Sequence, residues 1–133
     1  MTRAVVADTG PLYAAVDPDD LCHRRSRADL ARLADEGFGV AVVGATLLEC
    51  YTLIVQRLGP SVANRWLREI EESATVVQPT LDDLTAAAQL TRRFNEPPLT
   101  MFDAVLAVVS QRLDLPVWTF DHRFDALHAP VWR

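Results

Sequence analysis

The chain has 133 residues, of which 50% are hydrophobic and 23% are charged, a composition typical of a single globular domain with its own core. No apolar run approaches the roughly 20 residues that span a bilayer, and no signal-peptide pattern precedes the first strand, so we expect a cytoplasmic protein without membrane association. The formal net charge of −5 excludes the broadly basic surface of proteins that coat nucleic acid nonspecifically.

The first half of the chain alternates between short apolar runs and longer segments with helical periodicity. The apolar runs are rich in β-branched residues, which is typical of strands buried on both faces of a sheet. Gly37 and the Gly59-Pro60 pair end two helices, and Ser61 is the expected N-cap of the helix that follows. The predicted elements are a strand at 4–7, helices at 11–16 and 21–36, a strand at 38–43, and helices at 44–58 and 61–72.

The second half continues this alternation. Pro97-Pro98 ends one helix, because proline cannot continue the helical hydrogen-bond ladder. The predicted elements are a strand at 74–78, helices at 81–95 and 101–113, a strand at 117–120, a short helix at 121–127 and an edge strand at 130–132. Strands that alternate with helices predict one α/β domain over 1–133, with a mostly parallel sheet of four to five strands covered by helices on both faces.

Four acidic residues fall at comparable places in this plan. Asp8 follows the first strand, Asp103 begins the most apolar helix, and Asp121 follows the fourth strand. Because the carboxyl ends of parallel strands and the N-termini of the following helices share one edge of the sheet, these three acids are expected on one rim. Glu49 lies about one turn into its helix and is close enough to lean toward the same rim.

Each of these acids also has a purely structural explanation. Asp8 can form an Asx-turn into the following helix. Asp103 completes a capping box with Thr100, and Asp121 suits the N-cap of the short helix after it. Glu49 lies opposite the apolar stripe of its helix, which favours exposure to solvent.

Burial and mutual repulsion favour a metal site over these explanations. The segment 104–109 is apolar on all sides, so its helix is expected to be buried, and an acid at its start is costly unless a partner compensates it. Two carboxylates about 4 Å apart repel by roughly 4 kcal/mol at an effective dielectric of about 20, and a cation relieves this repulsion. Oxygen ligands with retained waters suit Mg²⁺ or Mn²⁺.

The cysteines and histidines give no sign of another metal site. Cys22 and Cys50 are far apart and lie in helical patterns, so both are expected to be free and to pack as small hydrophobic residues. The histidines His23, His122 and His128 show no zinc-binding spacing.

Four motifs extend over essentially the whole chain. They are Val-Val-Ala-Asp-Thr at 5–9, Thr-Leu-Leu-Glu-Cys-Tyr at 46–51, Leu-Thr-Met-Phe-Asp-Ala at 99–104, and Trp-Thr-Phe-Asp-His-Arg-Phe-Asp-Ala-Leu at 118–127. In this order and spacing the chain resembles the PIN domain, and within that superfamily the VapC-type toxins of bacterial toxin–antitoxin pairs. It departs from the pattern at Gly10, where relatives often carry a small polar residue.

The resemblance implies a PIN-like three-layer fold and a Mg²⁺- or Mn²⁺-dependent ribonuclease that cleaves RNA phosphodiester bonds with a metal-activated water. Asp8, Glu49, Asp103 and Asp121 match the acidic quartet, and Thr119 matches the hydroxyl residue that commonly supports it. The resemblance also implies a homodimer that a cognate VapB-type antitoxin holds inactive.

Residues outside the quartet have open assignments. Asp125 is either a supporting acid or a surface residue. The candidates for contact with RNA, which are otherwise solvated helix faces, are Arg24, Arg25, Arg27, Arg92 and Arg93. The apolar residues that belong either to a partner interface or to the core are Leu53, Val55, Trp66 and Ile70.

Three other functions fit parts of the pattern. A phosphoacceptor receiver needs a lysine, and all 13 basic residues are arginines. A haloacid-dehalogenase-type phosphatase needs an aspartate two residues after Asp8, where Gly10 stands. The main alternative is therefore a noncatalytic RNA- or protein-binding module on the same fold.

Overall fold

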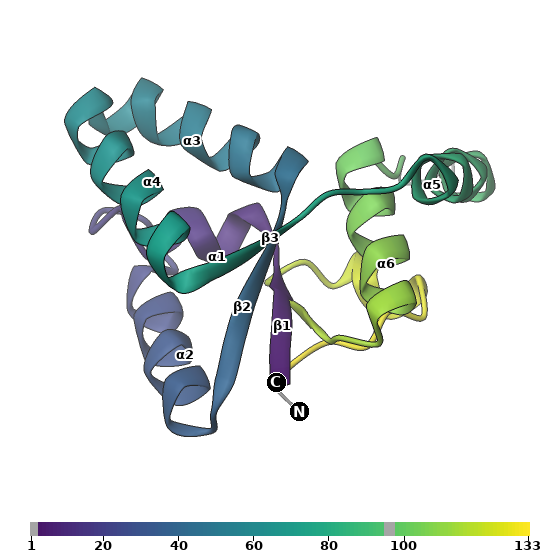
Figure 1. The fold of residues 1–133 in the computed structure, drawn as a ribbon, viewed down its shortest axis with the longest axis horizontal. Helices are drawn as coiled ribbons and strands as arrows, with labels where there is room; N and C mark the ends of the chain where they lie inside the picture. Colours follow the sequence, from purple (N-terminus) through teal and green to yellow (C-terminus); the bar gives the residue numbers. More distant parts are fainter. Residues whose placement is uncertain (1–2, 95–97) are drawn as a thin grey trace.

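A twisted sheet of parallel strands divides the molecule into two unequal groups of helices (Figure 1). The structure is a computed structural model that describes residues 3–94 and 98–133. The strand order is β3-β2-β1-β4, with β1 at Arg3–Ala7, β2 at Phe38–Val43, β3 at Ala74–Val77 and β4 at Val117–Trp118. The helices are α1 (Thr9–Ala14), α2 (His23–Asp35), α3 (Gly44–Leu58), α4 (Pro60–Ser73), α5 (Leu81–Arg93), α6 (Met101–Leu113) and α7 (Arg123–Ala126).

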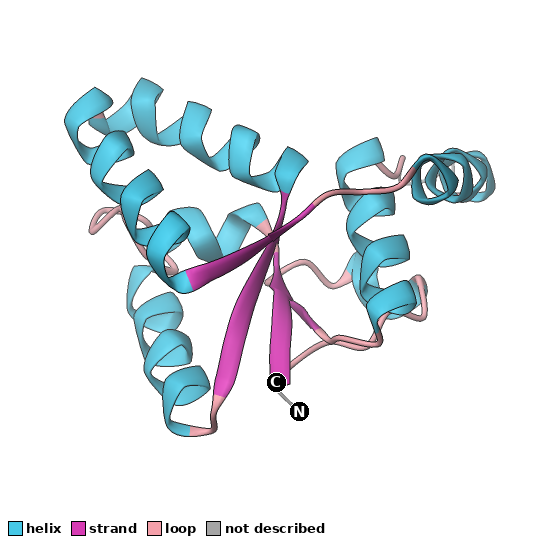
Figure 2. Ribbon diagram, viewed as in Figure 1, coloured by secondary structure: helices cyan, strands magenta, loops and turns pink. Residues whose placement is uncertain are grey.

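Alternate residues of the central strands enter two separate cores. Val5 and Ala7 of β1 pack with residues of α1 to α4, whereas Val6 packs with residues of α5 and α6. This division follows from the two-residue period of a strand, which sends neighbouring side chains to opposite faces. Figure 2 shows the helices on both sides of the strands. The predicted three-layer α/β fold is confirmed.

Most helices and strands fall where the sequence predicts them, but α2 and α7 each begin two residues later than predicted, and the N-cap of α7 is His122 instead of the predicted Asp121. Two other N-termini differ for local reasons. The first helix begins at Thr9 instead of residue 11, because Asp8 is its N-cap and accepts a hydrogen bond from the Thr9 backbone. The fourth helix begins at Pro60, with Gly59 at φ 89° as its N-cap, so the prediction of Ser61 as the cap is wrong. Proline suits the first helical turn, where its missing N–H has no partner to lose.

The predicted C-terminal strands are shorter in the structure. The fourth strand ends at Trp118, because the next residue, Thr119, turns its hydroxyl toward the backbone of Asp121. The expected edge strand at 130–132 is reduced to one parallel bridge between Val131 and Val117. The predicted end of the fifth helix, Asn95, lies outside the described residues.

Two further expectations concern cysteines and membranes. Cys22 and Cys50 are free, as predicted, and Cys50 is buried in the first core. Across residues 3–94 and 98–133, none of the helices has both the length and the apolar character required of a membrane span.

Candidate active site

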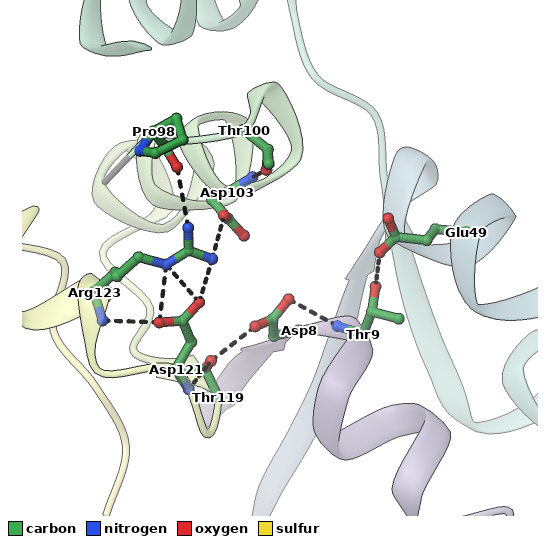
Figure 3. Close-up of polar contacts among 9 residues, drawn as sticks. All are labelled: Asp8, Thr9, Glu49, Pro98, Thr100, Asp103, Thr119, Asp121 and Arg123. Carbon is green, nitrogen blue, oxygen red and sulfur yellow. Dashed lines mark hydrogen bonds and ion pairs between the residues drawn. The ribbon is translucent and has the colours of Figure 1, made fainter. Parts of the chain in front are cut away.

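Asp8 lies at the carboxyl end of β1, beside the end of β4. Its backbone N–H donates to the carbonyl of Trp118 over 2.9 Å, so the two strands hold it in register. Its carboxylate accepts hydrogen bonds from the backbone N–H of Thr9 and from the hydroxyl of Thr119, both at 2.8 Å (Figure 3). Asp8 is therefore fixed from both sides.

Burial raises the pKa of Asp8 to about 6. The hydrogen bonds from Thr119 and Thr9 oppose this rise, and the negative charges of Asp103 and Asp121 add to it. Asp8 is thus a buried acid whose charge the surrounding protein only partly compensates.

Thr119 links Asp8 to Asp121. Its hydroxyl donates to Asp8 Oδ2 and accepts a hydrogen bond from the backbone N–H of Asp121 at 3.0 Å. Because Thr119 is itself buried, this hydroxyl has few alternative partners and orients the Asp8 carboxylate. Thr119 therefore contacts two of the acids, and its role in catalysis stays a prediction.

Arg123 lies between two other carboxylates of the group. Its Nη2 contacts Asp121 Oδ2 at 2.6 Å and Asp103 Oδ2 at 3.0 Å, and its Nε contacts both carboxylate oxygens of Asp121. Its Nη1 donates to the carbonyl of Pro98. The hydrogen bonds from Arg123 hold the pKa of Asp121 below its usual value. One guanidinium therefore neutralises part of the charge of two acids.

Asp103 is placed by the start of α6. Its backbone N–H bonds to the hydroxyl of the N-cap Thr100 at 3.2 Å, which is half of the predicted capping box. Its carboxylate contacts Arg123 instead of returning to the Thr100 backbone. The Asp103 carboxylate is therefore connected through Arg123 to Asp121.

Glu49 stands at the edge of this group. Its Oε1 accepts a hydrogen bond from the hydroxyl of Thr9 at 2.5 Å, and Thr9 is the residue after Asp8 (Figure 3). Asp8, Thr119, Asp121, Arg123 and Asp103 form one hydrogen-bonded set, which we call the acid network. Glu49 is half-buried and reaches only its border, through Thr9.

Two of these participants, Thr9 and Arg123, were not assigned from the sequence. Thr9 adjoins Asp8 in the first motif, and Arg123 follows Asp121 by two residues, a spacing at which an aspartate accepts from the backbone N–H. The spacing signals that local turn, but the contact of Arg123 with Asp103 depends on the packing of α6 and is not visible in the sequence.

The donor set fits a hard divalent cation. Carboxylate oxygens are the ligands that Mg²⁺ and Mn²⁺ prefer, Asp103 and Asp121 already share one cationic group, and Asp8 is a buried acid near both. Within residues 3–94 and 98–133, however, no group of three or more His, Cys, Asp or Glu side chains is placed to hold a metal ion. The guanidinium of Arg123 meets part of the demand for positive charge.

The other residues with open assignments lie mostly away from the network. Asp125 forms an exposed ion pair with Arg133 at 2.9 Å, so it is a surface residue. Trp66 and Ile70 are buried in the first core, and Leu53 and Val55 pack against it, which accounts for all four apolar candidates.

Only one of the candidate arginines on α2 lies near the network. Arg25 stacks on the ring of Phe120, whereas Arg27 lines a separate cavity of about 420 Å³ between α2 and α4. Arg24 is exposed, and Arg92 and Arg93 lie in the last turn of α5, on the other side of the sheet.

Comparison with known proteins agrees with this fold. A family model described as the PIN domain matches residues 5–129, and no curated protein matches the chain. VapC20 of Mycobacterium tuberculosis, a sarcin–ricin loop cleaving toxin, is similar in structure with a TM-score of 0.82 and 22% identity, over 97% of this chain and 98% of that one.

Two toxin–antitoxin complexes are also similar. VapBC2 of Rickettsia felis, bound to a DNA fragment from its promoter, matches with a TM-score of 0.76 and 11% identity over 98% of this chain and 97% of that one. A toxin–antitoxin complex of Klebsiella pneumoniae matches with a TM-score of 0.74 and 16% identity over 97% and 96% of the two chains. At these identities the likeness is one of fold.

Proposed function

The chain belongs to the PIN domain family, and on that premise we propose that it is a metal-dependent endoribonuclease of the VapC toxin type. The observation that supports this proposal most is the acid network, in which Asp8, Asp103 and Asp121 come from three distant segments and share one rim of the sheet. Arg123 pairs with Asp103 and Asp121, while Asp8 accepts hydrogen bonds only from Thr9 and Thr119 among the described residues, and this lack of positive charge is costly for three neighbouring acids.

Asp8, Asp103 and Asp121 would hold the metal, with Glu49 completing the set from the side of Thr9. When bound, Mg²⁺ or Mn²⁺ supplies an activated water for attack on phosphorus and stabilises negative charge on the phosphate oxygens. Thr119 keeps the Asp8 carboxylate oriented by its hydrogen bond. Arg123 balances Asp103 and Asp121 while the cation is absent, and its side chain is 39% exposed, so it can turn toward a phosphate oxygen of the RNA.

A cleavage assay tests this function. The purified protein is mixed with a structured RNA in Mg²⁺, in Mn²⁺ and in EDTA, and the products are resolved on a denaturing gel. We expect cleavage in either metal, loss of cleavage in EDTA and recovery when Mg²⁺ is added back. Equal cleavage in EDTA and in Mg²⁺ would contradict the proposed chemistry.

We propose a VapB-type antitoxin as the natural inhibitor. Two of the similar structures are toxin–antitoxin complexes, and the acid network already accommodates one guanidinium. An arginine supplied by an antitoxin would find the same carboxylates as partners. Growth arrest on expression of the chain alone, relieved when an antitoxin is co-expressed, is the expected result.

We also propose that the protein forms a homodimer in solution. The resemblance to VapC-type proteins is its only support, so a direct mass measurement is needed. Light scattering coupled to size-exclusion chromatography should give twice the mass of the 14.8 kDa chain. A monomer mass at assay concentrations would overturn the proposal.

One observation favours a second function, a noncatalytic RNA- or protein-binding module. Arg123 already bonds Asp103 and Asp121, and the described residues include no assembled metal cluster. On this alternative the acid network is a rigid structural unit. Metal-independent binding of RNA without any cleavage in Mg²⁺ or Mn²⁺ would favour the module over the enzyme.

A further inference from the structure

A second cleft lies beside the acid network, between α2 and the C-terminal part of the chain. Its volume is about 310 Å³. Thr119 and Asp121, which belong to the acid network, are among the residues that line it. Arg25 and Arg32 line it from α2, and Phe120 and Trp132 line it from the C-terminal part. We call this space the Arg25 cleft. The Arg25 cleft and the acid network are therefore adjacent.

The walls of the Arg25 cleft are held in place by specific contacts. The indole Nε1 of Trp118 donates to Asp29 Oδ2 at 2.9 Å, which ties the end of β4 to α2. The guanidinium of Arg32 lies 3.9 Å from the centroid of the Trp132 ring and also pairs with Glu36 at 3.0 Å. These contacts fix both sides of the cleft before any ligand binds.

Arg25 differs from the other arginines of the cleft. Its guanidinium lies 4.2 Å from the centroid of the Phe120 ring, but it has no hydrogen bond or ion pair with any residue that the structure describes. In contrast, Arg32 pairs with Glu36 and Arg133 pairs with Asp125. A guanidinium stacked on a ring is held by its face, while its N–H groups remain free to bond an oxyanion in the plane.

We propose that the Arg25 cleft binds the RNA backbone next to the bond that is cleaved, with Arg25 as the ligand of one phosphate. This inference rests on the proposed function, because it describes how the RNA reaches the acid network. Positively charged side chains that contact the phosphate backbone are typical of single-stranded nucleic-acid sites, and here the ring of Phe120 holds the guanidinium of Arg25 in place. In a chain of net charge −5, such a local phosphate ligand offsets the repulsion between the acids and the RNA.

Neighbouring arginines allow a matched test. Arg25→Gln removes the proposed ligand, and Arg24→Gln removes an equal charge from the preceding, exposed residue, which does not line the cleft. Binding of a fluorescein-labelled oligouridylate is measured by fluorescence anisotropy in EDTA at several salt concentrations. We expect Arg25→Gln to weaken binding about five- to tenfold and to reduce the salt slope by about one, and Arg24→Gln to stay within about twofold of wild type. Equal effects of the two variants would overturn the proposal.

The ring of Phe120 provides a second test. Phe120→Leu leaves the charge of Arg25 but removes the surface on which its guanidinium stacks. We expect an intermediate loss of affinity, and Arg25→Lys should recover only part of the binding, because an ammonium stacks and bonds less specifically. Wild-type affinity of Phe120→Leu together with full rescue by Arg25→Lys would show that charge alone matters and would contradict a built site.

Failure of this inference is distinguishable from failure of the proposed function. If the oligouridylate binds through Arg25 but no RNA is cleaved in Mg²⁺, the cleft is supported and the nuclease function is wrong. If cleavage depends on the acids while Arg25→Gln binds and cleaves like Arg24→Gln, the function is supported and the cleft proposal is wrong.

Discussion

The N-termini of α5 and α6 carry the same local pattern, Thr-x-x-Asp, but the structure uses their two aspartates differently. At α5, Thr80 and Asp83 form a complete capping box, and Asp83 also binds Arg112 at 2.8 Å. Asp83 is only 3% exposed, and the hydrogen bonds from Arg112 lower its pKa. One acid has one cationic partner and a closed cap, so its charge is balanced locally.

At α6 the same pattern leads to a different result. Asp103 completes only the Thr100 half of the box and shares Arg123 with Asp121, while Asp8 lies near both. Three acids here have one guanidinium among them, and burial raises the pKa of Asp8. The charge balance around an acid, and not the helix-capping motif it belongs to, therefore separates a structural aspartate from one available for chemistry.

The largest effect that tests this comparison is on cleavage. We expect Asp103→Asn and Asp8→Asn each to reduce RNA cleavage at least a hundred- to thousandfold, because each removes a carboxylate that would hold the metal ion. The measurement is single-turnover cleavage in Mg²⁺, and circular dichroism should show an unchanged fold. Magnesium-dependent cleavage near the wild-type rate in either variant would contradict the assignment of the acid network.

Asp83→Asn should lower the stability of the fold and leave RNA cleavage unchanged. It removes the carboxylate that Arg112 binds through two oxygens, so we expect the free energy of unfolding to fall by about 2 kcal/mol. Urea unfolding at neutral pH measures this loss. Cleavage per folded molecule, measured well below the melting temperature, should remain close to wild type. A loss of cleavage without a loss of stability would erase the distinction between the two aspartates.

The α/β fold and the edge of the sheet that carries the acids could be predicted from the sequence, because strand composition, helix periodicity and Gly or Pro boundaries are local signals. The same signals also place Asp8 and Asp121 correctly after β1 and β4. The capping pattern alone does not separate Asp103 from a simple cap, since Thr80 and Thr100 begin the same pattern, and Asp103 was assigned from the apolar helix after it and from the family resemblance. Only tertiary packing brings Arg112 to one helix and Arg123 to the other. The position of Glu49 likewise depends on how α3 meets Thr9, which no local pattern specifies.

The charge balance can also be tested by the affinity of the site for Mn²⁺ when Arg123 is replaced. Arg123→Gln leaves Asp103 and Asp121 without the guanidinium that they share, so a divalent cation no longer competes with a resident positive charge. We expect Mn²⁺ to bind about tenfold more tightly to this variant than to wild type at pH 8, measured by isothermal titration calorimetry without RNA. Arg112→Gln, which disrupts the balanced pair at α5, is the matched control and should leave Mn²⁺ binding unchanged. Weaker binding of Mn²⁺ to Arg123→Gln would indicate that the arginine organises the site instead of competing for it.

Asp8 and Asp83 should also differ in how they make the stability of the fold depend on pH. The folded pKa of Asp8 is about 6 against an ordinary value of 3.8, so the native state binds more protons between these values, and stability falls as the pH rises through this range. The pKa of Asp83 is lowered, so its contribution is present at neutral pH and is lost on acidification. In EDTA, Asp8→Asn should therefore be more stable than wild type at pH 8, by up to about 3 kcal/mol, and close to it near pH 4.

Thermal or urea unfolding of Asp8→Asn and Asp83→Asn at both pH values measures these opposite trends, and added Mn²⁺ makes them specific to the site. Wild type should gain stability in Mn²⁺, because the cation binds the folded acid network and removes the cost of the Asp8 charge, whereas Asp8→Asn should gain less. If Asp8→Asn is instead destabilised at pH 8 like Asp83→Asn, Asp8 is also a balanced structural acid, and the raised pKa does not mark a place for a cation. The sign of the stability difference between Asp8→Asn and wild type at pH 8 therefore shows whether the acid network carries an excess of negative charge that a bound cation would relieve.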